Sequence, residues 1–253
     1  MKKRLYYFSS GPRERVLKRI LNYGWQVETL FLTSLDKTPR LAKTIEIAEK
    51  YNLPIKFLNK KDLQNLYPQL DPKLVCFSLG FKYLFSDSFI NHFNLMLNVH
   101  GTLLPYYAGA RTINWIIENG ENFSGVTVHK IDKGMDTGPI LLQERFVISP
   151  FDTGKSLYRK TLEFEPQVVE KCLKKIENKN LTFFEQPKSK VQQYPNRIPE
   201  HSRLDIKQPL ESLINKIKAA DHENYPAYFF YNGKKIGIKI FRIEKPKNES
   251  DLI

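Results

Sequence analysis

Apolar runs and amphipathic stretches alternate along residues 1–150 of the chain. Runs rich in β-branched and aromatic side chains favour strands, and between them apolar side chains recur every three or four positions, as on one face of a helix. The pattern predicts strands over 4–9, 26–33 and 54–58, and helices over 11–23 and 39–51. This is a β-α-β alternation.

The next part of the chain continues the alternation. Residues 74–81 are apolar enough for a strand buried on both faces, and a short helical segment separates them from a strand over 93–100. Two further strands, over 125–132 and 139–148, are expected as antiparallel additions, and 154–179 has a long helical pattern. Strands joined by helices need right-handed crossovers, which predicts a doubly wound α/β fold with a mostly parallel sheet. Ligands of such sheets bind beyond the carboxyl ends of the strands.

The C-terminal part differs in character. Residues 182–199 are polar and contain prolines, as expected of a linker, and 208–220 has a helical pattern. Asn232 and Gly233 lie between two strand-like runs, and a type I′ hairpin turn favours this pair because both positions need positive φ. We therefore predict three parts, namely a catalytic domain over 1–180, a linker over 181–199, and a helix plus β-hairpin module over 200–253.

Composition is that of a folded protein, with 41% hydrophobic and 26% charged residues. The formal net charge of +13 favours anionic ligands such as nucleic acid, a nucleotide diphosphate or a carboxylate tail. Charge alone does not choose among them. The lysines are spread along the chain without a block of five or six, which is typical of a solvated surface.

The sequence lacks the signatures of a membrane or secreted protein. No apolar run approaches the roughly 18 to 20 residues that cross a bilayer, and the first residues turn polar before a signal-peptide core could form. We expect a cytoplasmic protein with no membrane partner. Of the two cysteines, Cys76 lies in an apolar run, where a buried reduced thiol is favoured over a disulfide with Cys172.

Candidate chemistry gathers at the end of the strand predicted over 93–100. Asn98 and His100 project to the same side of that strand because successive side chains alternate faces. A Gly- and Pro-containing loop follows, and a second loop carries Asp132 and Asp136. Taken singly, a histidine at a strand end is usually structural, and an Asp in a Gly-rich turn usually caps the backbone.

The combination of these features resembles the folate-dependent formyltransferase family. Members share Asn-x-His, a Leu-Leu-Pro loop, Gly-x-Thr-x-His and a following Asp-x-Gly. The matching stretches here read NVHGTLLPYYAGART and GVTVHKIDKGMDTGPILLQE, and residues 74–148 follow the pattern well. The resemblance implies a formyltransferase-type, Rossmann-like fold and N10-formyltetrahydrofolate as the formyl donor. It implies no metal, and no histidine spacing typical of zinc ligands is present.

The resemblance also implies a catalytic trio of Asn98, His100 and Asp136. Asn98 would donate a hydrogen bond to the developing oxyanion, and His100 would exchange a proton as acid or as base. Asp136 would orient the imidazole, favour its charged form or hold a water. For His129 in the Thr-x-His strand, structural, supporting and substrate-facing roles all stay open.

For the donor, the family's pterin slot uses backbone groups of two loops. These groups map onto Phe81, Lys82, Tyr83, Leu84, Asp132, Lys133 and Gly134. Side-chain identity is loosely constrained there, and loop packing explains Tyr83 and Leu84 equally well.

The family's acceptors are a glycinamide ribonucleotide, the methionyl group on initiator transfer RNA, or an amino sugar on a nucleotide diphosphate. After Arg197 the sequence continues for 56 residues, fewer than the roughly 100 of the C-terminal barrel in transfer-RNA formyltransferases. The tail resembles that of sugar N-formyltransferases, so we favour the amino sugar. The alternatives are a methionyl-tRNA formyltransferase with a shortened C-terminal domain and a non-catalytic nucleotide- or RNA-binding relative.

Under this hypothesis the acceptor contacts several groups. Ser10, Gly11 and Arg13, where a strand leads into a helix, would hold the diphosphate, although an ordinary helix cap explains them too. The expected sugar and base contacts are Tyr106, Tyr107, Arg111, and Tyr225 with Tyr228 or Phe230, where plain packing is the alternative. Ala108 departs from relatives that carry Arg before the glycine, which leaves the acceptor's fine identity open. A homodimer also stays open.

Overall fold

A single seven-stranded sheet organises the molecule. The structure is a computed structural model that describes residues 3–33, 39–221, 223–249 and 253. The strands are β1 (Arg4–Ser9), β2 (Gln26–Thr33), β3 (Ile55–Leu58), β4 (Val75–Leu79), β5 (Met96–His100), β6 (Phe123–Lys130) and β7 (Ile140–Val147). Their spatial order is β3-β2-β1-β4-β5-β6-β7. The first five are parallel, and β6 and β7 join antiparallel. The predicted doubly wound fold is confirmed.

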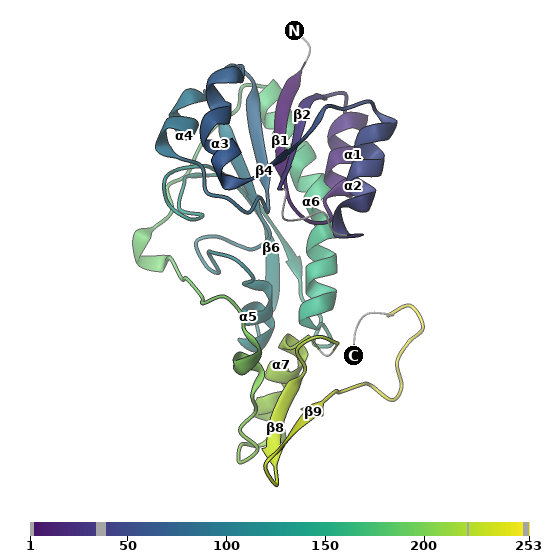
Figure 1. The fold of residues 1–253 in the computed structure, drawn as a ribbon. Helices are drawn as coiled ribbons and strands as arrows, with labels where there is room; N and C mark the ends of the chain where they lie inside the picture. The colour runs from purple at the N-terminus through teal and green to yellow at the C-terminus, as the bar shows by residue number, and fades with distance from the viewer. Residues whose placement is uncertain (1–2, 34–38, 222, 250–252) are drawn as a thin grey trace.

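Helices cover both faces of the sheet (Figure 1). One face carries α1 (Glu14–Asn22), α2 (Ala42–Lys50) and the long α6 (Gly154–Glu177), and the other carries α3 (Lys60–Leu66) and α4 (Asp87–His92). Short 3₁₀ turns are η2 (Pro39–Leu41), η3 (Tyr67–Gln69), η4 (Lys188–Lys190) and η5 (Pro199–Ser202). None of the helices in the described part of the chain combines the length and the apolar character that a membrane span requires.

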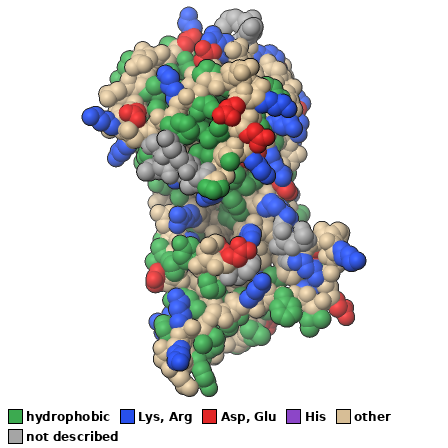
Figure 2. All heavy atoms as spheres, turned by 45° about the vertical axis from the view of Figure 1, so that its right-hand side comes forward, with side chains coloured by type: hydrophobic (Ala, Val, Ile, Leu, Met, Phe, Trp, Pro, Cys, Tyr) green, Lys and Arg blue, Asp and Glu red, His purple; other side chains and the backbone are tan. Residues whose placement is uncertain are grey.

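The surface carries the basic residues in dispersed form. Figure 2 shows Lys and Arg side chains scattered over one face, with acidic side chains among them. This agrees with the spacing of lysines along the sequence, and the face shown carries no continuous basic stripe. The net charge of +13 is therefore not concentrated on this face.

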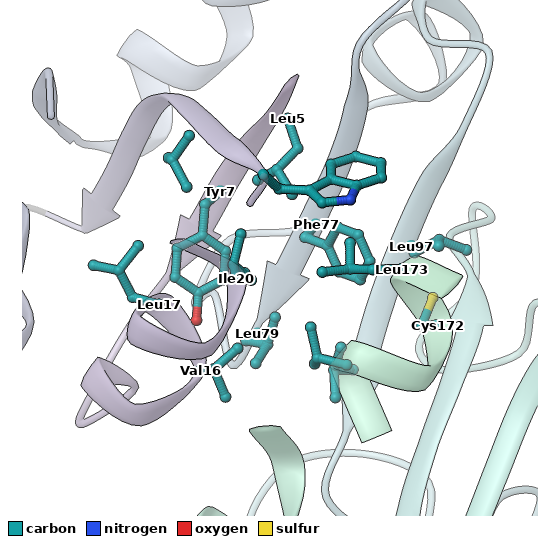
Figure 3. Close-up of a cluster of buried hydrophobic side chains, with 14 of the residues drawn as sticks. Leu5, Tyr7, Val16, Leu17, Ile20, Phe77, Leu79, Leu97, Cys172 and Leu173 are labelled. Carbon is teal, nitrogen blue, oxygen red and sulfur yellow. The ribbon is translucent and has the colours of Figure 1, made fainter. Parts of the chain in front are cut away.

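The core follows from strand alternation. On β1, Leu5 and Tyr7 face α1 and α6, whereas Tyr6 and Phe8 face α3 and α4. All four side chains are at most 5% exposed. The first of these layers is shown in Figure 3, where side chains of β1, β4 and β5 meet those of α1 and α6. Cys172 lies in this layer and Cys76 in the opposite one, both buried and free of a disulfide.

Several element ends have local causes. The helix predicted from residue 11 begins only at Glu14 because Gly11 has φ +75° and precedes Pro12. The strand predicted to residue 81 ends at Leu79 because Gly80 has φ +60°. Helix α3 was not predicted, since it has only seven residues and its start depends on a capping box made by Asn59.

The C-terminal part forms a module beyond the end of the sheet (Figure 1). It contains α7 (Leu210–Ala219) and a hairpin of β8 (Ala227–Tyr231) and β9 (Lys234–Ile238). Asn232 and Gly233 have φ of +46° and +74°, so the predicted hairpin turn is confirmed. The module packs on α5 (Ile113–Glu118), a short helix that the sequence pattern did not predict. The division into 1–180, 181–199 and 200–253 stays a prediction.

Candidate functional site

A cavity of about 850 Å³ opens at the carboxyl ends of β1, β4 and β5. Its walls also include the loops after β4, β5 and β6 and one side of α6. The predicted site residues that line it are Ser10, Gly11, Arg13, Phe81, Lys82, Tyr83, Leu84, Asn98, His100, Arg111, Asp132, Lys133, Gly134 and Asp136. Tyr106, Tyr107 and Tyr225 are not among the lining residues.

Strand β5 delivers Asn98 and His100 to this cavity. Val99 between them points into the opposite layer, where it is 4% exposed and packs in the core. Asn98 is paired with His129 of β6 across the antiparallel ladder, so the side chains of these two residues lie side by side. The period-2 geometry of two neighbouring strands thus brings an amide and two imidazoles to one sheet edge.

Asp136 comes to this edge from the loop between β6 and β7. Its Oδ1 accepts a hydrogen bond from Asn98 Nδ2 at 3.1 Å, and its Oδ2 accepts one from the Gly109 N–H at 3.0 Å. His100 Nδ1 and His129 Nε2 each lie 3.4 Å from a carboxylate oxygen of Asp136. The Asp136 carboxylate therefore links its own loop and the loop after β5 to strands β5 and β6.

The ionisation of Asp136 is set by this network. Burial alone would raise the pKa of its carboxyl group, because the charged form loses solvation. The positive charges of His100 and His129, together with hydrogen bonds from His129 and the Gly109 N–H, outweigh burial and hold the pKa of Asp136 well below its ordinary value. Asp136 is thus a carboxylate throughout the neutral and mildly acidic range.

The Asn98 amide nitrogen has two partners within the protein. His129 Nδ1 lies 2.9 Å from the carbonyl of Lys130, which can only accept, so this nitrogen carries a proton. In the neutral ring Nε2 then accepts from Asn98 Nδ2, 3.1 Å away, while the second hydrogen points to Asp136, and a substrate oxygen must replace one of these contacts. In the charged ring Nε2 instead donates to Asp136, and Asn98 keeps one hydrogen for a substrate oxygen.

His100 is held from both ends of its ring. Its Nε2 lies 3.0 Å from the backbone carbonyl of Tyr107, which also accepts from the Thr102 hydroxyl at 3.1 Å. Its Nδ1 faces Asp136. Because neither the carbonyl nor the ionised Asp136 carboxylate can donate, both ring nitrogens of His100 face hydrogen-bond acceptors.

The two loops predicted to hold the donor border the cavity in different ways. The Phe81 ring is stacked on Phe85 with ring centroids 5.5 Å apart, and both residues line the cavity. Leu84 is 69% exposed. In the second loop, the Asp132 carboxylate accepts from the Gly134 N–H and the Thr137 hydroxyl in an Asx-type turn.

The predicted diphosphate contacts line the cavity where β1 leads into α1. The Ser10 hydroxyl is already hydrogen-bonded to Thr33, at 3.0 Å. Arg13 forms an ion pair with the buried Glu165 of α6, with Nε and Oε2 3.1 Å apart. Arg111 is exposed on the rim and adopts φ +58°.

The three tyrosines outside the lining have other neighbours. Tyr107 is 6% exposed, and its ring stacks on Tyr194 while its hydroxyl donates to Glu121 at 2.6 Å. Tyr106 is 40% exposed, and Tyr225 is 56% exposed in the C-terminal module. Tyr107 thus reaches the site only through its backbone carbonyl.

The structure adds residues that the sequence pattern did not single out. Arg40, Ser78, Tyr158, Glu165 and Asn196 also line the cavity. A signal existed for Glu165, because it follows the buried Leu157 and Thr161 at steps of four and so interrupts the apolar stripe of α6. No group of three or more His, Cys, Asp or Glu in the described part of the chain is arranged to hold a metal ion.

This fold and site define a class of protein that comparison with known families identifies. Residues 32–173 match the formyl transferase family, and the chain belongs to that family. The matched segment contains Asn98, His100, His129 and Asp136, so the resemblance found in the motifs is confirmed.

The names of individual relatives describe two kinds of formyltransferase, which differ in acceptor. The methionyl-tRNA formyltransferase of Thermotoga maritima is 29% identical over 209 residues, which are 81% of this chain but only 66% of that protein, just under two thirds of its length. A sugar 3N-formyl transferase, WlaRD, solved in the presence of dTDP and 5-N-formyl-THF, has a TM-score of 0.72 and 25% identity over 92% of this chain and 84% of that one. An N-formyltransferase from Helicobacter canadensis, in complex with folinic acid and dTDP-3-aminofucose, shares the fold with a TM-score of 0.73 and 24% identity over 93% of this chain and 86% of that one.

Proposed function

We propose that this protein transfers a formyl group from N10-formyltetrahydrofolate to the amine of an amino sugar linked to a nucleotide diphosphate. The observation that carries the proposal is the meeting of Asn98, His100 and Asp136 at one wall of an 850 Å³ cavity. Cavities of roughly 300 to 1,000 Å³ are typical of sites for small organic ligands.

The reaction needs three tasks that these side chains can perform. The acceptor amine attacks the formyl carbon, the bond from that carbon to N10 breaks, and one proton moves from the attacking nitrogen to N10. Asn98 Nδ2 stabilises the oxyanion once it exchanges an internal hydrogen bond for the substrate oxygen. His100 exchanges the proton, and Asp136, held as a carboxylate, stabilises the imidazolium.

A folate donor is supported by the character of the two bordering loops. Both loops line the cavity, and the side chains of Phe81 and Asp132 are engaged within the protein. This favours backbone groups at 81–84 and 132–134, other than the Gly134 N–H, as the contacts of a flat, hydrogen-bonding ring. The names of the solved WlaRD and Helicobacter canadensis structures include a formylated folate and folinic acid. On this basis we assign the pterin to the slot between these loops.

The nucleotide-sugar acceptor is supported by arginines that line the cavity. Arg40 and Arg111 are exposed, and Arg13 is less exposed and paired with Glu165. Guanidinium groups suit a diphosphate because they offer several donors in a fixed plane. The similarity to the sugar 3N-formyl transferase also extends over 92% of the chain, more than the catalytic segment alone.

Methionyl transfer RNA is the second candidate acceptor. It is favoured by the name of the Thermotoga maritima relative and by the net charge of +13. In the described residues after Arg197, however, the chain forms α7 and a two-stranded sheet, without a barrel of the size expected for nucleic-acid binding.

An acceptor panel tests the proposal. The protein is incubated with N10-formyltetrahydrofolate and, in separate reactions, dTDP-, UDP- and GDP-linked amino sugars, methionyl transfer RNA and glycinamide ribonucleotide, with tetrahydrofolate release as the readout. We expect turnover with at least one amino sugar and a nearly flat response between roughly 50 and 200 mM salt. Turnover with transfer RNA alone, falling steeply with salt, would assign the second candidate.

A further inference from the structure

The segment 181–199, which we call the strap, binds both loops that flank the catalytic residues. Phe184 exchanges two backbone hydrogen bonds with Ile140 of β7, at 2.7 and 2.8 Å. Farther along, the Gln192 carbonyl accepts from the Ala108 N–H at 3.0 Å, and its own N–H donates to Pro105 at 3.1 Å. The strap therefore lies against the loop after β5 and the loop before β7.

Gln186 is the side chain of the strap that reaches the catalytic loop. It is 7% exposed, and its Nε2 donates to the carbonyls of Asp136 and Gly138, each at 2.8 Å. The two residues it holds lie 50 and 48 positions earlier in the chain. One amide group thus ties together two carbonyls of a single turn.

The turn that Gln186 holds is not one that Asp136 adopts without support. Asp136 has φ +57°, a left-handed conformation that non-glycine residues occupy at a cost. At Gly138, a Cβ atom would lie 1.9 Å from the carbonyl oxygen of Lys130, so the backbone passes directly over β6. This tight path directs the Asp136 carboxylate back to His100 and His129.

The other half of the Gln186 amide is unsatisfied. Its Oε1 is buried without a hydrogen-bond partner among the residues that the structure describes. Burying an unpaired amide oxygen is unfavourable, and an apolar side chain of similar size would avoid that cost. The two N–H donors of Nε2, which bind the carbonyls of Asp136 and Gly138, therefore explain why a glutamine occupies this position.

We infer that Gln186 is a positioning residue, which fixes the turn at 136–138 so that the Asp136 carboxylate stays aligned with His100. The inference rests on the proposed formyl transfer, because it assigns to the strap the task of holding that reaction's carboxylate. A residue outside the catalytic motifs then contributes to turnover without touching substrate.

The test compares Gln186→Met and Gln186→Glu with Gln193→Met. Methionine keeps the volume of Gln186 but has no donor, and glutamate keeps the shape but presents oxygens to the two carbonyls. Gln193 lies on the same strap with an exposed side chain, so Gln193→Met is the matched control. We expect both Gln186 variants to lose about 10- to 100-fold in kcat, with KM for both substrates changed less than about threefold. Unaltered kcat in both would overturn the inference.

A second readout is independent of turnover. The carboxyl carbon of Asp136, assigned by NMR with Asp136→Asn, is followed from pH 7 to pH 2. In the wild type we expect almost no titration, and in Gln186→Met an inflection towards the ordinary pKa of about 4, since the misplaced carboxylate loses its donors. Reduced kcat with an unchanged titration would assign Gln186 a general stabilising role and overturn the inference. If the wild type formylates no acceptor, the proposed function fails, and the titration still decides whether Gln186 positions Asp136.

Discussion

Two carboxylates, Asp136 and Glu165, border the same cavity, and their surroundings are opposite in kind. Asp136 meets two imidazoles, the amide of Asn98 and the N–H of Gly109. Glu165, 1% exposed on α6, has Arg13 as its charged partner. Although 3.1 Å separates them, Arg13 Nε and Glu165 Oε2 are not aligned as a hydrogen bond in the described structure.

The pKa values of the two carboxyl groups shift in opposite directions. Burial raises the pKa of both, because each loses the solvation of its charged form. Around Asp136 the donors outweigh burial, whereas around Glu165 burial outweighs the charge of Arg13. Hydrogen-bond donors and positive charges aimed at the carboxylate, and not its depth in the protein, therefore decide whether a carboxylate at this cavity stays charged.

The groups around Asp136 and those around Glu165 also suit different roles in the site. The side with Asp136 has an ionised acid, an amide and an imidazole within contact of one another, which is what a proton-coupled transfer needs. The side with Glu165 has a buried ion pair that shapes the wall near Gly101 and Tyr158.

The largest effect is expected on the Asp136 side. Asn98→Ala and His100→Ala should each lower kcat by at least about 100-fold, since each removes a group that stabilises the transition state. Glu165→Gln should stay within about tenfold of the wild type, because no reacting group contacts it in the proposed mechanism. Steady-state formyl transfer measures all three.

Folding is the control for this first prediction. Thermal unfolding should show that both variants remain folded, and Asn65→Ala on the exposed side of α3 should leave turnover unchanged. Near-normal turnover in Asn98→Ala, or a larger loss in Glu165→Gln than in His100→Ala, would contradict the division of the site.

A smaller effect is expected on stability at neutral pH. Asp136→Asn should lower the free energy of unfolding by about 1 to 3 kcal/mol, because donors that now face a carboxylate would lose a charged acceptor. Glu165→Gln should cost less than Asp136→Asn, since the charge of Glu165 is only partly compensated. Urea unfolding at pH 7 compares them, with Glu163→Gln on the exposed side of α6 as the matched control. The reverse ranking would show that Arg13 compensates Glu165 fully.

The smallest effect is the pH dependence of these differences. The folded-state pKa of Asp136 is lowered, so its stabilisation is present above the unfolded value of about 4 and is lost as pH falls towards the folded one. The advantage of the wild type over Asp136→Asn should therefore shrink by on the order of 1 to 2 kcal/mol as pH falls from 5 to 2.

For Glu165 the sign is reversed. Its folded-state pKa is raised, so its contribution is present below the unfolded value of about 4 and is lost as pH rises through the folded one. Glu165→Gln should therefore gain stability relative to the wild type between pH 4 and pH 7. Parallel pH trends for Asp136→Asn and Glu165→Gln, measured by urea unfolding at each pH, would rule out opposite pKa shifts.

Some parts of the site could be predicted because they depend on local geometry. Asn98 and His100 share a face of β5 by strand alternation, and Val99 is buried behind them for the same reason. Outside the site, the hairpin turn between β8 and β9 was predictable because Asn232 and Gly233 tolerate the positive φ that it needs. The motif that contains Asp136 was found through resemblance to a family, since neither spacing nor composition specifies which of two loop carboxylates returns to the histidine.

Other parts were beyond the pattern of the sequence. Tyr107 was expected to face the acceptor, but its ring stacks on Tyr194 and only its carbonyl meets His100. Gln186 lies in a polar stretch that reads as a plain linker, yet it is buried against the catalytic turn. Arg13 was expected to face a diphosphate, and the structure pairs it with Glu165.

The strands along the chain, the longer helices, the buried alternation of β1 and β5, and the hairpin turn follow from local sequence, because each depends on side-chain period or backbone φ within a few residues. Which polar groups meet depends on how the whole chain folds. Asp136 meets Asn98 across 38 positions and Gln186 across 50. Such pairs arise when the sheet and its loops close on one another, and the free energy that selects them comes from burying and satisfying donors and acceptors that are far apart in the chain.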